Sequence, residues 1–303
     1  MNNGLVKGTA AALRAWYRHT SWTFGKRLVW HHGVSRLLRT GLSLRADTRF
    51  GARMNLRFPD TVQSYVYFFG VWEPAITDYL LATLRPGDIV IDIGANVGYD
   101  SLLAAHCVGS AGQVFAIEAS PSVFRLLQDN LALNQTRGVT AINAAVCAEV
   151  GPVAIYLHDP TNLGGSTIVP SVALDRAATH EAIVRGAPLS DLVPPATIRA
   201  ARLIKIDVEG AEWPVVQGFA PLLSELSPRT ELLIEVNAQA LRNQGSSVAA
   251  FVDLFRAAGF TAYVLDNPYC VDAYLKPPSG VPVPLRDYDF DQRDLLFRRA
   301  SGA

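Results

Sequence analysis

The sequence has few cysteines, and none of them lies close to another. Its 303 residues include three, Cys107, Cys147 and Cys270, without a C-x-x-C pair or other spacing typical of a metal site. Such a small, odd and scattered set excludes a disulfide-stapled fold and a structural zinc module. We therefore expect buried, reduced thiols in a cytoplasmic protein.

Long apolar runs and an excess of one charge are also missing. No segment reaches the roughly 18 consecutive apolar residues that a transmembrane helix needs, and the N-terminus lacks the order of a secretory signal. Lys+Arg and Asp+Glu both number 27, so no overall field attracts nucleic acid. Because 50% of the residues are hydrophobic, the chain can bury the core of a large α/β domain carrying an extension.

The first 50 residues differ from the rest of the chain in their charge. Asp47 is the one acid among nine basic residues, and aromatic residues are interleaved with them: Trp16, Tyr17, Trp22, Phe24 and Trp30. Two interpretations are open. Residues 1–70 form a helical extension that packs its aromatic side chains on the main domain, which we favour. Alternatively, a basic segment within residues 1–40 contacts an anionic membrane surface peripherally.

From about residue 75 onward, short β-branched segments alternate with segments of helical length. The expected sheet strands are 88–93, 112–119, 139–146, 201–208, 230–237, 260–266 and 293–299, with an extra strand over 151–158. The expected helices are 98–109, 121–134, 211–225 and 247–258, and Ser120 is the expected N-cap of the second. We expect a loop over 159–175 and a proline-rich connection over 276–285. This alternation predicts βαβ units and a mainly parallel sheet.

The stretch VIDIGANVGYD, residues 90–100, resembles a nucleotide-binding loop that lacks one glycine. Gly94 and Gly98 let the backbone turn tightly after the first strand, but Asn96 stands where a dinucleotide loop has its central glycine. Asp92 precedes the loop and Asp100 follows it. Asn96 and the two flanking acids disfavour a pyrophosphate and favour a ligand with an ammonium group and hydroxyls.

Glu118 ends the second strand, 26 residues after Asp92. A carboxylate at this position can accept hydrogen bonds from both hydroxyls of a ribose. An adenosine-type ribose, an amino-acid tail and no pyrophosphate describe S-adenosyl-L-methionine, whereas NAD fits poorly. The alternative is that Gly94 and Gly98 are ordinary turn glycines and Glu118 lies on the surface.

A second polar motif, LIKIDVEGAE, covers residues 203–212. Its apolar strand ends in Lys205, Asp207 and Glu209 before Gly210. In a doubly wound sheet this fourth strand lies beside the first, so Asp207 and Glu209 are expected near Asn96. Either these side chains form a structural ion-pair cluster, or Asp207 faces the methionine ammonium or the acceptor.

Together these motifs resemble the FkbM family of S-adenosylmethionine-dependent methyltransferases. The resemblance covers roughly residues 70–298 and rests on the paired D-x-G-A-N-x-G and K-x-D-V-E-G-x-E signatures and on LLIEVN at 232–237. It implies an α/β class I methyltransferase fold over residues 71–303, Rossmann-like and three-layered, whose seven-stranded, mostly parallel sheet has an antiparallel last strand. It also implies methyl transfer to a hydroxyl oxygen of a sugar or secondary metabolite.

The resemblance carries over position by position. It implies cofactor contacts from the loop, from the end of the second strand, from the residues after the third strand and from the second motif: Asp92, Gly94, Ala95, Asn96, Gly98, Glu118, Ala119, Asn143, Ala144 and Asp207. Residues 162–167 and 187–192 resemble family segments more loosely.

A hydroxyl acceptor needs a base that takes its proton as the oxygen attacks. The candidates are Asp207, Glu209, Glu235 and His158. Asp207, Glu209 and Glu235 could in principle hold a magnesium or calcium ion. No other cluster supports that ion, so the sequence predicts no metal.

Three alternatives stay open at this stage. They are an NAD-dependent oxidoreductase on a Rossmann fold, a non-enzymatic binding module, and a methyltransferase that acts on protein or nucleic acid. The zero net charge disfavours nucleic acid. We expect a small-molecule or glycan acceptor, and a cytoplasmic location either with or without peripheral membrane contact. Assembly is either as one chain or as a homo-oligomer.

Overall fold

A computed structural model describes residues 3–20, 23, 25–157, 163–175, 177–277 and 279–299. In these residues the central sheet has eight strands in the order β12-β11-β13-β10-β9-β3-β4-β5. Their bounds are β3 Ile89–Ile93, β4 Gln113–Glu118, β5 Val139–Asn143, β9 Leu203–Ile206, β10 Glu231–Asn237, β11 Phe260–Leu265, β12 Val283–Pro284 and β13 Gln292–Arg299. All seven predicted sheet strands are present.

The five strands from β5 to β10 run parallel to one another. The last strand, β13, lies between β10 and β11 and is antiparallel to both. This confirms the class I methyltransferase fold and its antiparallel last strand. The expected count of seven is short by one, because two residues of the proline-rich connection pair with β11 as the edge strand β12.

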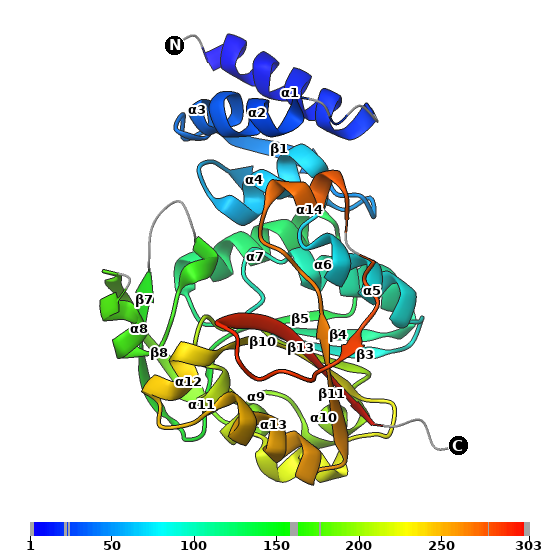
Figure 1. Cartoon of the computed structure of the whole chain (residues 1–303), viewed down its shortest axis with the longest axis vertical. Helices are drawn as coiled ribbons and strands as arrows, with labels where there is room; N and C mark the ends of the chain where they lie inside the picture. The colour runs from blue at the N-terminus through cyan, green and yellow to red at the C-terminus, as the bar shows by residue number, and fades with distance from the viewer. Residues whose placement is uncertain are drawn as a thin grey trace.

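Helices cover both faces of the sheet, which gives the three expected layers (Figure 1). On one face lie α5 Pro74–Thr83, α6 Tyr99–Val108 and α7 Pro121–Leu133; on the other lie α10 Pro195–Ala200, α11 Glu212–Gln217 and α13 Val248–Ala257. All four residues of β9 are buried. Three of them, Leu203, Ile204 and Ile206, are aliphatic, as a parallel sheet covered on both faces requires, and the fourth is Lys205. Ser120 caps α7 as predicted, since its side chain accepts from Val123 N.

The N-terminal region is helical over much of its length, as expected. It contains α1 Asn3–His19, α2 Lys26–Val29, the π-helical turn η1 Trp30–Val34, α3 Ser35–Leu38 and α4 Thr61–Phe69. A hairpin of β1 Ser43–Asp47 and β2 Arg53–Arg57, which the sequence did not predict, separates α3 from α4. In Figure 1 the first three helices stack on this hairpin and on α4.

Aromatic contacts hold the N-terminal helices on α4. The ring of Tyr17 lies 5.9 Å from Phe68 and 5.0 Å from Phe69, and Trp30 lies 4.6 Å from Tyr65. Tyr274 stacks on Tyr65 at 4.2 Å from α14 Val271–Leu275, another unpredicted helix. These described rings thus pack mostly on one another within residues 1–70, and they contact the rest of the chain at Tyr274. The division of the chain at residue 70 stays a prediction. Trp22 and Phe24 lie outside the described residues.

Two of the N-terminal basic residues are used inside the protein. Arg18 Nη2 donates to the carbonyl oxygens of Asp47 and Val66 at 2.6 and 3.0 Å. Lys26 is buried and its Nζ donates to the Tyr17 and Thr20 carbonyl oxygens at 3.1 and 2.6 Å, at the C-terminal end of α1. Cations at such carbonyls satisfy acceptors that the helix leaves open.

A second sheet stands beside the main one, at the left of Figure 1. It has the order β6-β8-β7, from β6 Ala145–Val146, β7 Gly151–Leu157 and β8 Thr179–Ala187. The extra strand is therefore confirmed as β7, but its partner β8 was not predicted. The third strand was predicted too long, because the chain leaves the main sheet at Ala144. Part of the expected loop is helical, as η3 Leu163–Gly165 and α8 Pro170–Asp175.

Four short elements complete the description: α9 Leu189–Leu192, the 3-10 helices η2 Gly109–Ala111 and η4 Ala220–Glu225, and α12 Ala238–Asn243. All three cysteines are free, but Cys107 and Cys147 are only half-buried and Cys270 is exposed, so the prediction of buried thiols is wrong. In the part of the chain that the structure describes, no helix has both the length and the apolar character to cross a membrane.

Candidate active site

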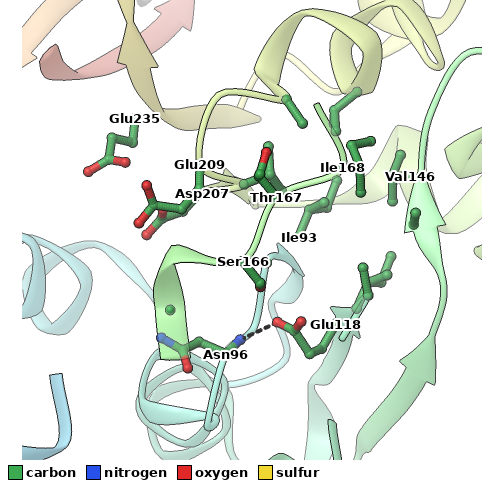
Figure 2. Close-up of a pocket in the computed structure, with 18 of the residues that line it drawn as sticks. Ile93, Asn96, Glu118, Val146, Ser166, Thr167, Ile168, Asp207, Glu209 and Glu235 are labelled. Carbon is green, nitrogen blue, oxygen red and sulfur yellow. Dashed lines mark hydrogen bonds between the residues drawn. The ribbon is translucent and has the colours of Figure 1, made fainter. Parts of the chain in front are cut away.

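A cavity of about 420 Å³ opens beyond the carboxyl ends of the parallel strands. Its lining includes the residues at the ends of four neighbouring strands, namely Ile93 and Gly94, Ile117 and Glu118, Asp207 and Val208, and Glu235. Open α/β sheets bind ligands at this edge. Figure 2 shows the carboxylates of Asp207, Glu209 and Glu235 together on one side, and Val146 and Ile168 on another.

Gly94 brings the two sequence motifs into contact. It has φ +85°, and a Cβ added to it would lie 1.8 Å from the carbonyl oxygen of Asp207. Only glycine fits this contact, because a side chain would overlap the neighbouring backbone. Gly98 has another function. It precedes α6 with φ +91°, and a Cβ there would lie 2.6 Å from Leu127 Cδ1 on α7, so Gly98 permits close helix packing.

Glu118 lies at the edge of the cavity and is only 5% exposed. Its Oε2 accepts from Asn96 N at 2.9 Å (Figure 2), and its Oε1 accepts from Ser120 N at 2.8 Å. Burial raises the pKa of Glu118 to about 7, and these two backbone hydrogen bonds oppose the rise. Glu118 is therefore not a surface residue. The sequence alternative that placed it there is wrong.

Asn96 and Asn143 support the backbone around Glu118. Asn96 has φ +49°, a left-handed conformation that asparagine tolerates better than most residues, and it lines the cavity. Asn143 donates from its amide to the carbonyl oxygens of Glu118 and Ala119 at 2.8 and 3.0 Å. In the described chain Asn143 itself does not line the cavity, whereas Ala119 and Ala144 do.

One end of the cavity is apolar. Its walls there are Ile117 from β4, Val146 from β6, Ile155 from β7, and Ala211 and Val215 at the start of α11. The small sheet thus closes the cavity beside Glu118. This explains why the chain leaves the main sheet after β5.

The acids flanking the loop lie behind it. Asp92 is buried and accepts a hydrogen bond from Ser101 Oγ at 2.6 Å. Asp92, Asp100 and the loop residue Ala95 do not belong to the described lining of the cavity. Burial raises the pKa of Asp92 to about 6, although Lys205 opposes the rise. The prediction that Asp92 and Asp100 face a charged ligand is therefore wrong, because neither side chain lines the cavity in the described chain.

Lys205 is a buried cation that pairs with Asp100 and Asp207. It is 4% exposed, and its Nζ lies 3.1 Å from Asp100 Oδ2 and 2.9 Å from Asp207 Oδ2. Burial by itself lowers the pKa of Lys205, but the surrounding carboxylates, Asp100 and Asp207 foremost, hold it well above its ordinary value. Asp207 thus belongs to the ion-pair cluster of the first interpretation and also lines the cavity. That it faces the methionine ammonium or the acceptor stays a prediction.

The opposite end of the cavity is rich in acids and aromatic residues. Glu209 and Glu235 line it, as the sequence predicted, and Tyr269 donates its hydroxyl to Glu235 Oε1. Burial raises the pKa of Glu235 well above its ordinary value, and Asp207 adds to the rise. His158 lies outside the described residues.

Sequence analysis missed several residues of this end. They are Thr61, Val62, Trp72, Glu73, Tyr269 and Gln292, which line the cavity, and Asp294 behind it. Two of them had a signal in the sequence: Glu73 lies within the range 70–298 that the family resemblance covers, and Asp294 is an acid next to the apolar residues 295–297 of the expected last strand.

The N-terminal region takes part in the cavity. Thr61 and Val62 of α4 line it. Asp60 caps α4 by accepting from Gln63 N and holds the opposite loop by accepting from Leu163 N at 2.8 Å. The cavity therefore spans the boundary that the sequence suggested at residue 70.

Comparison with known proteins identifies the family. The family model "Methyltransferase FkbM domain" matches residues 92–262. Methyltransferase sdnD of Sordaria araneosa is 28% identical over 179 residues, 49% of this chain and 67% of that protein. The 31-O-demethyl-FK506 methyltransferase FkbM of Streptomyces tacrolimicus is 27% identical over 212 residues, 61% and 77% of the two chains. The hexuronic acid methyltransferase AglP of Haloferax volcanii is 21% identical over 172 residues, 55% and 63%.

The family match covers more than half of the chain and contains both signatures, with Gly94, Glu118 and Asp207. Among solved structures, an S-adenosylmethionine-dependent O-methyltransferase of Thermotoga maritima aligns over 89% of this chain and 82% of its own, with 15% identity and a TM-score of 0.43. That likeness is too weak to add to the assignment. On the family match, this chain belongs to the FkbM family of S-adenosylmethionine-dependent methyltransferases.

Proposed function

We propose that this enzyme methylates a hydroxyl oxygen of a small molecule or glycan, such as a sugar or a secondary metabolite. The observation that carries the proposal is one continuous cavity, with the ribose-type acid Glu118 near its apolar end and the carboxylates Asp207, Glu209 and Glu235 at the other. Carboxylates suit a hydroxyl acceptor because they accept its hydrogen bonds and its proton. The names of two relatives, a hexuronic acid methyltransferase and a 31-O-demethyl-FK506 methyltransferase, agree with it.

The lining of the cavity fits S-adenosylmethionine. The apolar walls at Val146 and Ile155 are suited to the adenine ring, and Glu118 has lone pairs left for the ribose hydroxyls. The backbone at Gly94 and Asn96, facing Asp207, is suited to the amino-acid tail. We assign Asp92, Ala95, Gly98 and Asn143 the supporting function of holding this wall in shape.

When bound, the cofactor supplies an electrophilic methyl group on a positively charged sulfur. The protein must hold the acceptor oxygen in line with that methyl group and exclude water. We assign Asp207 as the base that receives the hydroxyl proton, because it lines the cavity and its Oδ2 lies 2.9 Å from the buried Lys205 ammonium. Glu209 and Glu235 then hold the acceptor, and His158 stays a further candidate for the base.

A direct test uses a cofactor with a carbon-13 methyl group and a panel of hydroxyl, amine and thiol acceptors. Formation of S-adenosylhomocysteine together with a methoxy carbon signal in the product supports the proposal. Label that appears only on nitrogen, sulfur, protein or nucleic acid overturns it. Calorimetry with NAD provides a second check, because tight NAD binding would revive the oxidoreductase alternative.

Location and assembly stay predictions. Flotation with anionic vesicles tests peripheral membrane contact through residues 1–40, and light scattering tests the homo-oligomer. Arg18 and Lys26 are occupied by carbonyl oxygens, so contact with a membrane would depend on the exposed basic residues of this segment.

A further inference from the structure

Three acidic side chains meet beside the acceptor end of the cavity. Glu73 precedes α5, Glu235 lies in β10 and Asp294 lies in β13. All three are buried, and one oxygen of each lies within 4.8 Å of the others. Glu235 and Asp294 are directly opposite each other in the antiparallel β10–β13 register. The sheet therefore fixes two members of the cluster on one face.

Neutral donors orient the three carboxylates. Asn267 Nδ2 donates to Glu73 Oε1 at 2.9 Å and to Asp294 Oδ2 at 3.0 Å. Tyr269 donates its hydroxyl to Glu235 and lies 3.4 Å from Asp294 Oδ2. Such outer contacts hold ligand oxygens in place around an ion. The buried cation described nearby, Lys205, pairs with Asp100 and Asp207 instead.

One oxygen of the cluster has no partner. Glu73 is 3% exposed, and its Oε2 has no hydrogen-bond partner among the described residues. A buried polar atom without a partner is destabilising, and more so when the group is charged. This oxygen calls for a ligand that has a positive charge, because a further acceptor would only add repulsion.

We propose that Glu73, Glu235 and Asp294 bind one hard divalent cation, Mg²⁺ or Mn²⁺. Carboxylate oxygens without nitrogen or sulfur are the donors that these ions prefer. Ligands at about 2.1 Å from one ion lie at most about 4 Å apart, so the cluster needs only a small contraction. The sequence predicted no metal because it considered a different set, Asp207, Glu209 and Glu235.

The position of the cluster suggests what the ion does. Glu73 and Glu235 line the cavity, so an ion between them has coordination positions facing the acceptor. Resting on the proposed function, we infer an acceptor that presents two neighbouring oxygens, such as a vicinal diol or a hydroxy acid. The ion would bind both oxygens and lower the pKa of the hydroxyl that is methylated.

The test measures binding of Mn²⁺ to the chelator-treated full-length enzyme, by calorimetry and by electron paramagnetic resonance. We expect one Mn²⁺ per chain, displaced by Mg²⁺. Glu73→Gln and Asp294→Asn should each weaken binding by at least about tenfold. The control Asp253→Asn alters an exposed acid paired with Arg256 and should bind normally. Absence of bound Mn²⁺ in the wild-type enzyme, or equal binding in all variants, overturns the proposal.

Two further measurements separate the possible failures. Circular dichroism and binding of S-adenosylhomocysteine show whether each variant is folded. Methyl transfer is then compared with and without Mg²⁺, using a diol and its mono-hydroxyl analogue. Activity that needs no metal contradicts the inferred acceptor but leaves the proposed hydroxyl methylation intact.

Discussion

Gly94 and Asp207 touch through their backbones, although they belong to different motifs: a Cβ on Gly94 would lie 1.8 Å from the Asp207 carbonyl oxygen. The contact joins the loop after β3 to the end of β9. The wall proposed for the cofactor and the carboxylate proposed as the base are therefore joined by the close approach of the Gly94 and Asp207 backbones.

Gly94→Ala should destabilise the protein by about 3 kcal/mol or more, because it combines a backbone clash with a strained positive φ. Gly87→Ala is a matched control, since Gly87 has φ +90° but nothing within 4 Å of the added Cβ. The control should lose only about 1 to 2 kcal/mol. Urea unfolding measures both. Equal losses would show that conformation alone, and not the contact with Asp207, requires glycine.

Glu118→Ala should weaken binding of S-adenosylhomocysteine by roughly 1 to 2 kcal/mol, the value of hydrogen bonds to a charged acceptor. Because the pKa of Glu118 is raised to about 7, wild-type affinity should fall as pH falls through that value. Calorimetry across this range should find the dependence reduced in Glu118→Gln.

Glu181→Gln controls for loosening of the helix start behind Glu118. Glu181 accepts from Ser120 Oγ at 2.7 Å and from Ser122 N at 2.9 Å and does not belong to the described lining of the cavity. If it weakened affinity as much as Glu118→Ala, the ribose would be held by other groups.

Stability should fall as pH rises from mildly acidic to mildly alkaline values. Burial raises the pKa of Asp92 to about 6 and of Glu212 to about 8, above their ordinary 3.8 and 4.5. Between the ordinary and raised values the folded state binds more protons than the unfolded chain. The free energy of unfolding therefore decreases as pH rises from 3.8 to about 6 because of Asp92, and from 4.5 to about 8 because of Glu212.

Glu212→Gln tests this dependence at one residue. Glu212 Oε1 accepts from Gly210 N at 2.9 Å, while its Oε2 is buried without a partner in the described chain. The variant keeps an acceptor without a titrating group, so at alkaline pH it should be more stable than wild type, by on the order of 3 kcal/mol. Urea unfolding at several pH values measures the slope. An unchanged slope would contradict the assignment.

Lys205→Met should mainly lower the stability of the protein, whereas Asp207→Asn should mainly lower its turnover. Removal of Lys205 leaves Asp100 and Asp207 without their buried cation and should cost about 3 to 5 kcal/mol of stability. Asp207 is 25% exposed, so its change should affect folding far less while turnover falls by at least about a hundredfold. Unfolding and single-turnover assays separate the two effects. Full activity in Asp207→Asn would make Asp207 a structural residue.

Much of the fold was predictable because its signals are local. Apolar β-branched segments between turns marked the main-sheet strands, and Ser120 before Pro121 marked the start of α7. Strand β8 was missed because most of it is exposed or half-buried and has no continuous apolar face. Strand β12 has only two residues, Val283 and Pro284, and its pairing with β11 is a tertiary fact.

The direction of a side chain is not a local property. Asp92 and Asp100 flank the loop in sequence, and they were expected to face the ligand. In the structure Asp100 turns to Lys205 and Asp92 to Ser101, because a buried ammonium and a buried hydroxyl need those oxygens. The sequence predicts that Asn96 disfavours a pyrophosphate. Its left-handed backbone conformation is a second reason for asparagine at this position, because asparagine tolerates that conformation.

The sequence by itself determined the sheet, the loop after its first strand and the acid at the end of its second, and hence the family and the methyl donor. Each depends on residues that are neighbours in the chain. Only the tertiary structure decided which acids meet. Glu73, Glu235 and Asp294 come from three distant segments, and they converge because β13 inserts antiparallel beside β10 and the start of α5 places Glu73 beside both strands. Strand register and packing join segments that are far apart in the sequence, and they bring these three side chains together.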